Sequence, residues 1–179
     1  SAAIESSSSG PRPEAGEQPA DPFVAIAKGL PGPDDQAIVD LGAQISLLSD
    51  EAVKTARLAM LPEATVAYNQ AAQAIAEIGS ADPRAESARI LVESLIGVHR
   101  FHDARAAVRL LPRQDLQLLA LGKIAEAQGR LGLIESAFAW IEGEIRPEFR
   151  DELYQLVEQG ALGAIDESRM RRALSISNP

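Results

Sequence analysis

Two histidines and an aspartate form the most metal-like group in the sequence. His99 and His102 are three residues apart, a spacing that could place two imidazoles on one ion, and Asp103 adds a carboxylate. The chain contains only these two histidines, so no further imidazole completes a site. The repeat register described below places the group in an exposed bend between helices. A polar turn is the favoured interpretation, and we predict no metal and no other cofactor.

Four glutamates around Pro147 are the candidates for acid–base chemistry. Paired carboxylates can act as acid and base when burial separates their pKa values, but such a cluster in an acidic chain more often forms a solvated rim. The glycine pairs follow no predicted strand and the serines lie in no nucleophile elbow, so phosphate-binding and hydrolase motifs are absent. We therefore predict no catalytic residue and no enzymatic activity. The cluster comprises Glu142, Glu144, Glu148 and Glu152.

An aromatic pair and a basic cluster are the remaining candidates for contact with a partner. Trp140 and Phe138 lie in one predicted helix, where they could form an exposed anchor. Packing between adjacent hairpins is the favoured role for Phe138. Arg169, Arg171 and Arg172 could meet an acidic partner, or could favour the negative end of the last helix.

The composition favours closely packed helices. Hydrophobic residues make up 46% of the 179 residues but aromatic residues only 4%, so Ala, Leu, Ile and Val must build the core. Alanine has the highest helix propensity and lets backbones approach closely, and strand-favouring runs are absent. The length fits one globular domain.

Charge and hydropathy restrict the possible partners. The net charge of −9 opposes attraction to phosphate backbones, so we predict no nucleic-acid partner. No run approaches the roughly 18 apolar residues of a membrane span, so we predict no direct membrane insertion. The absence of Cys fits a reducing or an oxidising compartment. Because the first residue is Ser1 rather than Met, we expect a preceding segment that could hold a signal or an anchor, and a cytoplasmic and an extracytoplasmic location both stay open.

The chain divides into a tail and a helical domain. Residues 1–22 are rich in Ser, Gly and Pro, which predicts a disordered or extended linker or tail. A stalk and an inert tail are equally compatible with this composition. Residues 23–179 form the predicted helical-repeat domain, on which a short apolar turn at Phe23 could dock.

Apolar spacings of three and four, with caps and breakers between them, predict about nine helices and no strand. Asp34 or Asp35 is a plausible N-cap of the first helix, Pro147 begins the eighth and Gly160 ends it. The expected helices span approximately 34–48, 50–61, 62–78, 83–98, 104–111, 112–128, 134–143, 147–160 and 165–176.

Two stretches of the chain match when one is shifted so that Ala104 falls on Ala137, which indicates a repeated helical hairpin. Leu95 falls on Gln128 in this shift. Leu111 falls on Glu144, so the repeat is degenerate. The matching positions are Ala88, Leu91, Val92, Phe101, Ala104 and Val108 with Leu121, Ile124, Ala125, Ile134, Ala137 and Ile141.

The two hairpins resemble the tetratricopeptide-repeat family, whose unit is a helix–turn–helix of about 34 residues. Ala125 sits where the family keeps a small residue in the first helix. Ala104 and Ala137 sit where the family keeps the alanine that lets the two helices touch. The first-helix aromatic residue of the family is replaced by Ala88 and Leu121. The units that carry the resemblance span 85–104 and 118–137.

The resemblance implies an α-α superhelix, a solenoid of antiparallel hairpins whose first helices line a concave groove for an extended or helical peptide. By position, the groove residues would include Arg89 and Glu93 in one unit and Glu126 and Arg130 in the next. The basic and asparagine clamp of some family members is not found. The alternative for these four residues is that they form ordinary solvated pairs at a spacing of four.

We therefore predict a protein- or peptide-binding scaffold that uses the concave face of a tetratricopeptide-like array. The alternative is a structural subunit, or an end-packing domain of a larger assembly, with no transient ligand. The sequence does not fix the partner or the oligomeric state.

Overall fold

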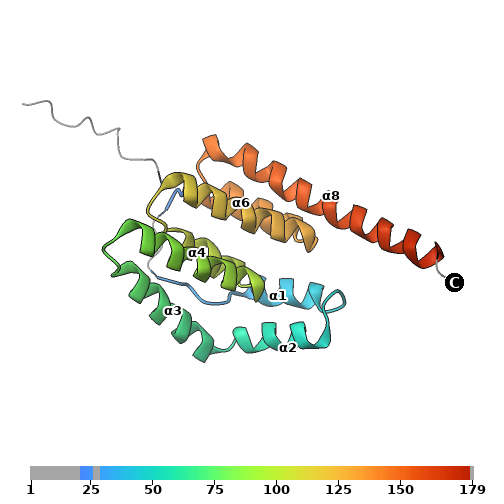
Figure 1. Ribbon diagram of the computed structural model, residues 1–179, viewed down its shortest axis with the longest axis horizontal. Coiled ribbons are helices and arrows are strands. Elements are labelled where there is room, and N and C mark those ends of the chain that lie inside the picture. The colour runs from blue at the N-terminus through green and yellow to red at the C-terminus, as the bar shows by residue number, and fades with distance from the viewer. Residues whose placement is uncertain (1–20, 26–28, 178–179) are drawn as a thin grey trace, which may run out of the picture.

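Helices account for nearly all regular structure among the residues that the structure describes (Figure 1). A computed structural model describes residues 21–25 and 29–177, with side chains to Ile176. The described residues form eight α-helices and no strand, apart from a single antiparallel bridge between Phe23 and Ile145. The predicted all-α class is confirmed. The helices are α1 (Asp35–Gln44), α2 (Asp50–Ala59), α3 (Pro62–Ala76), α4 (Ala81–Gly97), α5 (Phe101–Val108), α6 (Gln114–Arg130), α7 (Ile134–Glu144) and α8 (Pro147–Ser177).

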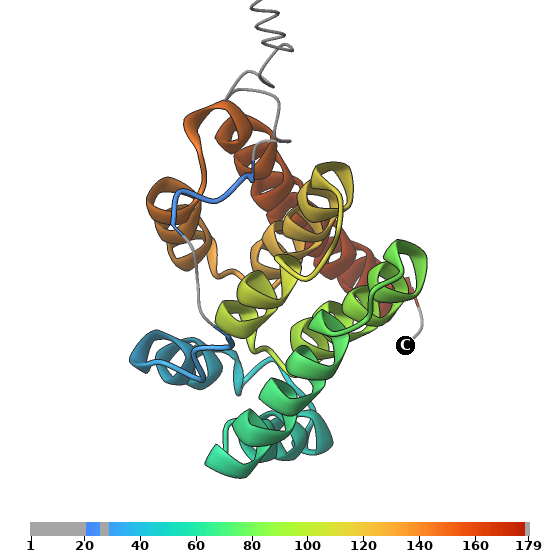
Figure 2. The same ribbon diagram turned by 90° about the vertical axis from the view of Figure 1, so that its left-hand side faces the viewer.

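From α4 to α7 the helices form two consecutive hairpins, α4 with α5 and α6 with α7. Figures 1 and 2 show α3, α4, α6 and α8 lying side by side. Helix α5 packs against α4, and α7 packs against both α6 and α8. The small residues predicted at the centre of each hairpin are buried, since Ala104 and Ala137 are 0% exposed. Their lack of bulk lets the two helices of a hairpin touch.

The two hairpins predicted to be repeats share their backbone geometry as well as their sequence pattern. Two residues after the end of each first helix, the backbone is in the left-handed region, at His99 with φ 66° and at Gly132 with φ 76°. The next N–H, of Arg100 or Leu133, donates to the carbonyl five residues earlier at 2.9 Å in both hairpins. This is the bonding of a helix end closed by a left-handed residue. The sequence repeat therefore extends to the turns.

The first half of α8 continues the same row of helices, although the predicted sequence repeat did not include it. Val157 follows Ile124 at the same interval that separates Ile124 from Leu91, and all three side chains are buried. Leu153 is also buried. This equal interval can be read from the sequence, but the match covers a single helix rather than a complete hairpin.

Helix α8 also corrects the predicted boundaries. Two helices were expected, with Gly160 as the end of the first, but α8 is continuous over 31 residues. Gly160 lies within it because the two backbones meet there: a Cβ at Gly160 would overlap the carbonyl of Glu126 in α6. A Cβ at Gly129 would likewise overlap the carbonyl of Val157. Glycine serves close approach at these positions rather than helix termination.

An extended segment before α1 crosses the hairpins and is held by backbone pairing. The N–H of Val24 donates to the carbonyl of Glu144 at 2.7 Å, and the N–H of Arg146 donates to the carbonyl of Pro22 at 2.9 Å. Phe23 is buried, and Arg109 covers its ring at 4.1 Å. Most of the predicted tail, residues 1–20, lies outside the described residues.

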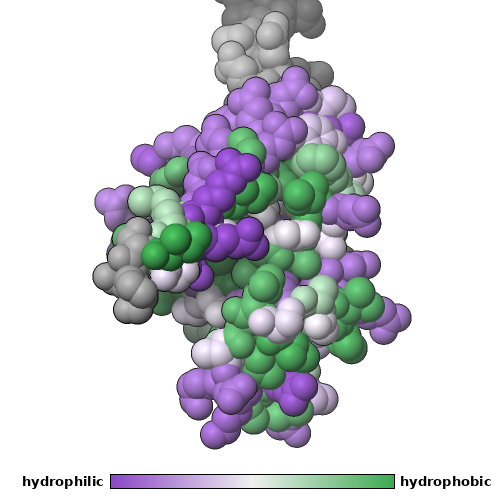
Figure 3. Space-filling model, turned by 90° about the vertical axis from the view of Figure 1, so that its right-hand side faces the viewer, coloured by the Kyte–Doolittle hydropathy of each residue, from purple (hydrophilic) through white to green (hydrophobic). Residues whose placement is uncertain are grey.

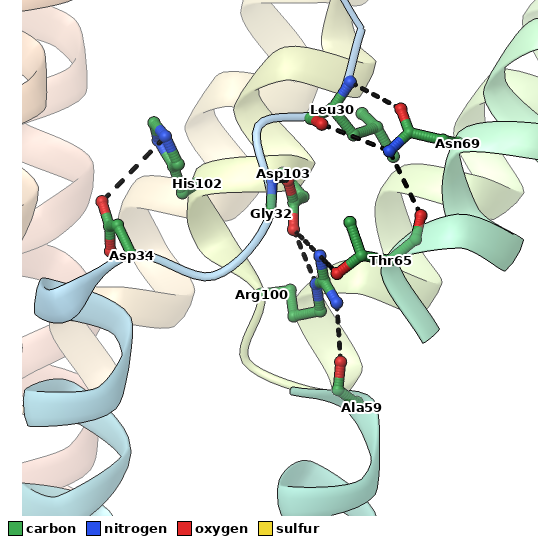
Figure 4. Close-up of polar contacts among 9 residues, drawn as sticks. All are labelled: Leu30, Gly32, Asp34, Ala59, Thr65, Asn69, Arg100, His102 and Asp103. Atoms are coloured by element: carbon green, nitrogen blue, oxygen red, sulfur yellow. Dashed lines mark hydrogen bonds and ion pairs between the residues drawn. The ribbon is translucent and has the colours of Figure 1, made fainter. Parts of the chain in front are cut away.

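A buried ion pair joins this segment to three helices (Figure 4). The Arg100 side chain is fully enclosed, and its Nε donates to Asp103 Oδ2 at 2.6 Å. The two terminal nitrogens of its guanidinium donate to the Ala59 carbonyl at 2.7 Å and to Thr65 Oγ1 at 2.9 Å. The second Asp103 oxygen accepts the N–H of Gly32 at 2.8 Å. One guanidinium therefore fixes the positions of α2, α3 and the extended segment.

Candidate functional site

A pocket of about 200 Å³ opens between α4 and α6. Its floor is apolar, and charged side chains surround its mouth. Leu119, on the α6 side, is 61% exposed. The lining residues are Asp82, Ala85, Glu86, Arg89, Val92, Glu93, Leu111, Leu116, Leu119, Ala120 and Lys123.

Four charged residues form a continuous chain of ion pairs on the rim of this pocket. Arg89 donates to Glu86 on one side at 2.6 Å and to Glu93 on the other at 2.7 Å. Lys123 of α6 then donates to the second oxygen of Glu93 at 3.0 Å. Glu93 therefore links the two helices that frame the pocket.

The ion pairs stabilise the charged forms of the rim residues. The hydrogen bond from Arg89 holds the pKa of Glu86 below its ordinary value. Hydrogen bonds from Lys123 and then from Arg89 lower the pKa of Glu93. The same two carboxylates raise the pKa of Arg89. The charged forms of Glu86, Arg89 and Glu93 are therefore favoured, and the rim can attract charged groups.

The four predicted groove residues do not lie together. Arg89 and Glu93 line the pocket, whereas Glu126 and Arg130 lie further along α6, outside it. Arg130 donates to Glu167 of α8 at 2.9 Å. At that end of α6 the glycine contacts bring α8 against the α6 backbone, so the two helices close together there.

Sequence analysis missed Lys123 and most of the apolar floor. Lys123 is the repeat counterpart of Ile90, which does not line the pocket, so the repeat register contained no signal for it. The contribution of Leu111 and Leu116 had no signal either. They flank the connection between α5 and α6, whose path only the packed structure defines.

The residues considered for metal binding have separate partners. The Nδ1 of His99 contacts Gln44 Oε1, and Asp103 is held by Arg100. His102 lies 3.0 Å from Arg105 and 4.0 Å from Asp34. Asp103 is buried, which corrects the expectation that the bend would be exposed. Within the described residues, no group of three or more histidine and carboxylate side chains could hold a metal ion.

The glutamates around Pro147 and the single tryptophan have structural contacts. Glu144 accepts two hydrogen bonds from Arg105, at 3.0 and 3.1 Å, while Glu142, Glu148 and Glu152 are exposed. Trp140 is buried and donates through Nε1 to Gln128 at 2.6 Å, so it is not an exposed anchor. Phe138 packs edge-on against Tyr154 of α8, with ring centroids 4.9 Å apart. The packing role favoured for Phe138 is confirmed.

In the part of the chain that the structure describes, no helix has the length and apolar character needed to span a bilayer.

Searches against protein-family models, curated proteins and solved structures found no match to this chain. Comparison with other proteins therefore adds no family to this description.

Proposed function

We propose that the chain is a scaffold that binds a peptide segment of a protein partner in the pocket between α4 and α6. An apolar side chain of the peptide enters the pocket and contacts Val92, Leu111 and Leu116. Charged groups beside that side chain contact the rim. The tetratricopeptide-like use of a face lined by first helices, expected from the sequence, belongs to this proposal.

The single observation that carries the proposal is an apolar pocket inside a charged rim. An apolar floor supplies the free energy of binding through burial, and fixed charges around it orient the ligand. The rim has three carboxylates, Asp82, Glu86 and Glu93, and two cations, Arg89 and Lys123. The excess of negative charge favours a peptide with a basic residue beside its apolar anchor.

Filling the pocket tests this proposal. Ala85 lines the pocket and is half-buried, so Ala85→Trp should occupy the space with little effect on the core. Peptides selected by the wild-type chain from a random displayed library are labelled, and their affinity is measured by fluorescence anisotropy. We expect Ala85→Trp to weaken binding at least about tenfold, the loss of one good apolar contact.

A matched substitution outside the pocket provides the control. Ala139 is an exposed residue of α7, so Ala139→Trp adds the same indole elsewhere and should leave binding unchanged. Equal affinity of the wild type and Ala85→Trp would refute the pocket as the binding site. Amide chemical-shift changes confined to α7 and α8 on addition of the peptide would also refute the pocket as the binding site.

A second candidate is a structural role in a larger assembly, because one end of the molecule exposes apolar side chains. Leu47 is 70% exposed and Leu58 is 56% exposed. Figure 3 shows hydrophobic surface in its lower part, where Figure 1 places α1 and α2. Exposed apolar patches are typical of permanent interfaces. Binding that is lost on Leu58→Asp and retained on Ala85→Trp would favour this candidate.

A further inference from the structure

A groove of about 390 Å³ runs along the exposed side of α2. Ala56 and Ala59, on the other side of this helix, are buried. Figure 1 shows α2 at the lower edge of the molecule, away from α8. The groove is therefore accessible to a partner. Its lining residues are Asp50, Val53, Lys54, Arg57, Leu58 and Leu61.

The groove has an apolar part that is exposed to solvent. Leu58 is 56% exposed and Leu61 is 46% exposed, while Val53 is half-buried. Leu58 lies near the end of α2 and Leu61 directly precedes α3, so the two leucines form an exposed apolar surface at the junction of the two helices. Removing this surface from water would contribute free energy to the binding of a partner.

Two cations line the same groove. Lys54 and Arg57 are the only basic residues between positions 30 and 80. Within the described residues, neither side chain forms an ion pair or a hydrogen bond. The negative end of α2 favours Arg57 in the last turn, and the positive end favours Asp50 in the first turn. Lys54, in the middle of the helix, has no such explanation.

We propose that this groove binds an acidic amphipathic helix of a protein partner. An apolar side chain of that helix packs against Leu58 and Leu61, and two carboxylates beside it contact Lys54 and Arg57. The two cations are three residues apart, so carboxylates three or four residues apart on the partner helix match their separation. The groove is separate from the pocket between α4 and α6, which favours a basic segment, so this proposal does not depend on the proposed function.

A membrane surface matches the groove less well. Helices that bind anionic lipid also combine exposed apolar residues with cations. Asp50 and Glu51 are exposed in the first turn of α2, and a planar anionic surface would approach them together with the cations. A peptide helix can place its carboxylates on the cations and leave this acidic turn in water. The charge pattern therefore favours a peptide over a lipid surface.

A second copy of α2 is also a poorer partner. An antiparallel pairing that sets Asp50 of each copy beside Arg57 of the other has its two-fold axis between positions 53 and 54. The two Lys54 side chains then lie next to each other at the axis, where they repel. An acidic segment of another protein contacts both cations without this repulsion.

Designed peptides test the charge preference. The probe is a fluorescein-labelled helical peptide of about 16 residues with a leucine stripe and two glutamates beside it, at a spacing of four. Matched peptides carry glutamine or lysine in place of both glutamates. Fluorescence anisotropy measures their affinity for the full chain at about 50 mM salt, where charges are weakly screened. We expect the glutamate peptide to bind about fivefold or more tightly than the glutamine peptide, and the lysine peptide to bind most weakly.

Charge reversal in the chain tests the two cations. Lys54→Glu combined with Arg57→Glu should weaken binding of the glutamate peptide about tenfold or more and should make the lysine peptide the preferred ligand. Arg169→Glu combined with Arg172→Glu is the matched control, because it reverses two exposed cations of α8 and changes the net charge equally. It should leave all three affinities nearly unchanged. Ala85→Trp should do so as well, since Ala85 lines the other pocket.

Several results would overturn the proposal. No binding of the glutamate peptide up to about 1 mM would do so, as would equal affinities for the glutamate and glutamine peptides. An equal loss of affinity in the α8 control would show that net charge, rather than the groove, attracts the peptide. Vesicles of phosphatidylserine and phosphatidylcholine provide the last arm. If they bind the wild type but not Lys54→Glu with Arg57→Glu, and the glutamate peptide does not compete, the groove binds lipid instead.

Discussion

His99 and Gly132 occupy equivalent left-handed positions, two residues beyond the ends of α4 and α6, although one residue has a large side chain and the other has none. Glycine adopts this conformation without steric cost, whereas a residue with a Cβ adopts it at a cost in conformational free energy. His99 is retained there by its own contacts. Its ring meets Gln44 and lies 5.9 Å from the ring of Phe101.

Gly132 provides the test of the backbone requirement. A Cβ at this position would meet nothing within 4 Å, so Gly132→Ala should affect only the conformational energy. We expect a loss of about 1 kcal/mol in the free energy of unfolding, measured by urea titration followed by circular dichroism. Gly143 has the same open surroundings inside a helix, and there alanine should stabilise by about 0.5 to 1 kcal/mol. Equal changes in the free energy of unfolding for Gly132→Ala and Gly143→Ala would show that the left-handed backbone at Gly132 is not the cause.

Removing the buried guanidinium should be among the most damaging single changes in the chain. Arg100→Met leaves the Asp103 carboxylate without its cation and leaves the Ala59 carbonyl without a donor. Breaking a buried pair on one side costs about 3 to 5 kcal/mol, which the same urea titration would measure. Arg89→Met removes two exposed ion pairs and should leave the unfolding midpoint almost unchanged. A small effect at Arg100 would show that the pair does not hold the segment before α1.

Burial of His99 predicts a pH-dependent stability. Desolvation lowers the pKa of His99 below its ordinary value of 6.5, so the unfolded chain binds the proton more tightly than the folded chain. The neutral ring is favoured in the fold, and this contribution is fully present above pH 6.5. Stability therefore falls as pH decreases from 6.5 through the lowered pKa.

The measurement compares the free energy of unfolding at a series of pH values between about 7.5 and 5, on either side of the ordinary histidine pKa. His99→Gln keeps a polar side chain without the titration, so it should flatten the curve in this range. The lowered pKa values of Glu86 and Glu93 affect the free energy of unfolding at lower pH. Their stabilising contribution is present above the ordinary pKa of 4.5 and is lost on further acidification. If the free energy of unfolding of His99→Gln changed with pH as steeply as that of the wild type, the pH dependence would not arise from His99.

The contact between α6 and α8 predicts a sharp difference between two glycines three residues apart. Gly160→Ala must push α8 away from the Glu126 carbonyl, and we expect a loss of at least about 2 kcal/mol. A Cβ at Gly163 would lie 3.8 Å from the Arg130 side chain, an ordinary contact, so Gly163→Ala should be neutral or slightly stabilising. Thermal unfolding of both variants measures the difference. Comparable midpoints would show that α8 can shift without cost.

Periodicity and composition determined the helices and the two repeated hairpins, because these depend on local spacing. The shift between the hairpins located the buried alanines Ala104 and Ala137, and it also holds for the turns that contain His99 and Gly132. These features follow from which residues share a helix face and which residues tolerate a turn. Arg89 and Glu93, two of the four residues that the family resemblance placed in a groove, line the pocket between α4 and α6.

Tertiary structure alone decided the features that join distant parts of the chain. Gln128 replaces an apolar residue in the repeat, yet it is buried because the Trp140 indole donates to it. Gly160 is indistinguishable in sequence from a helix end, but the α6 backbone occupies the space of its Cβ. The same contact brings α8 against α6 near Arg130, whereas Arg89 lines the pocket between α4 and α6. Local patterns record which face of a helix is apolar, whereas the distance between two helices depends on the residues that both contribute to the contact.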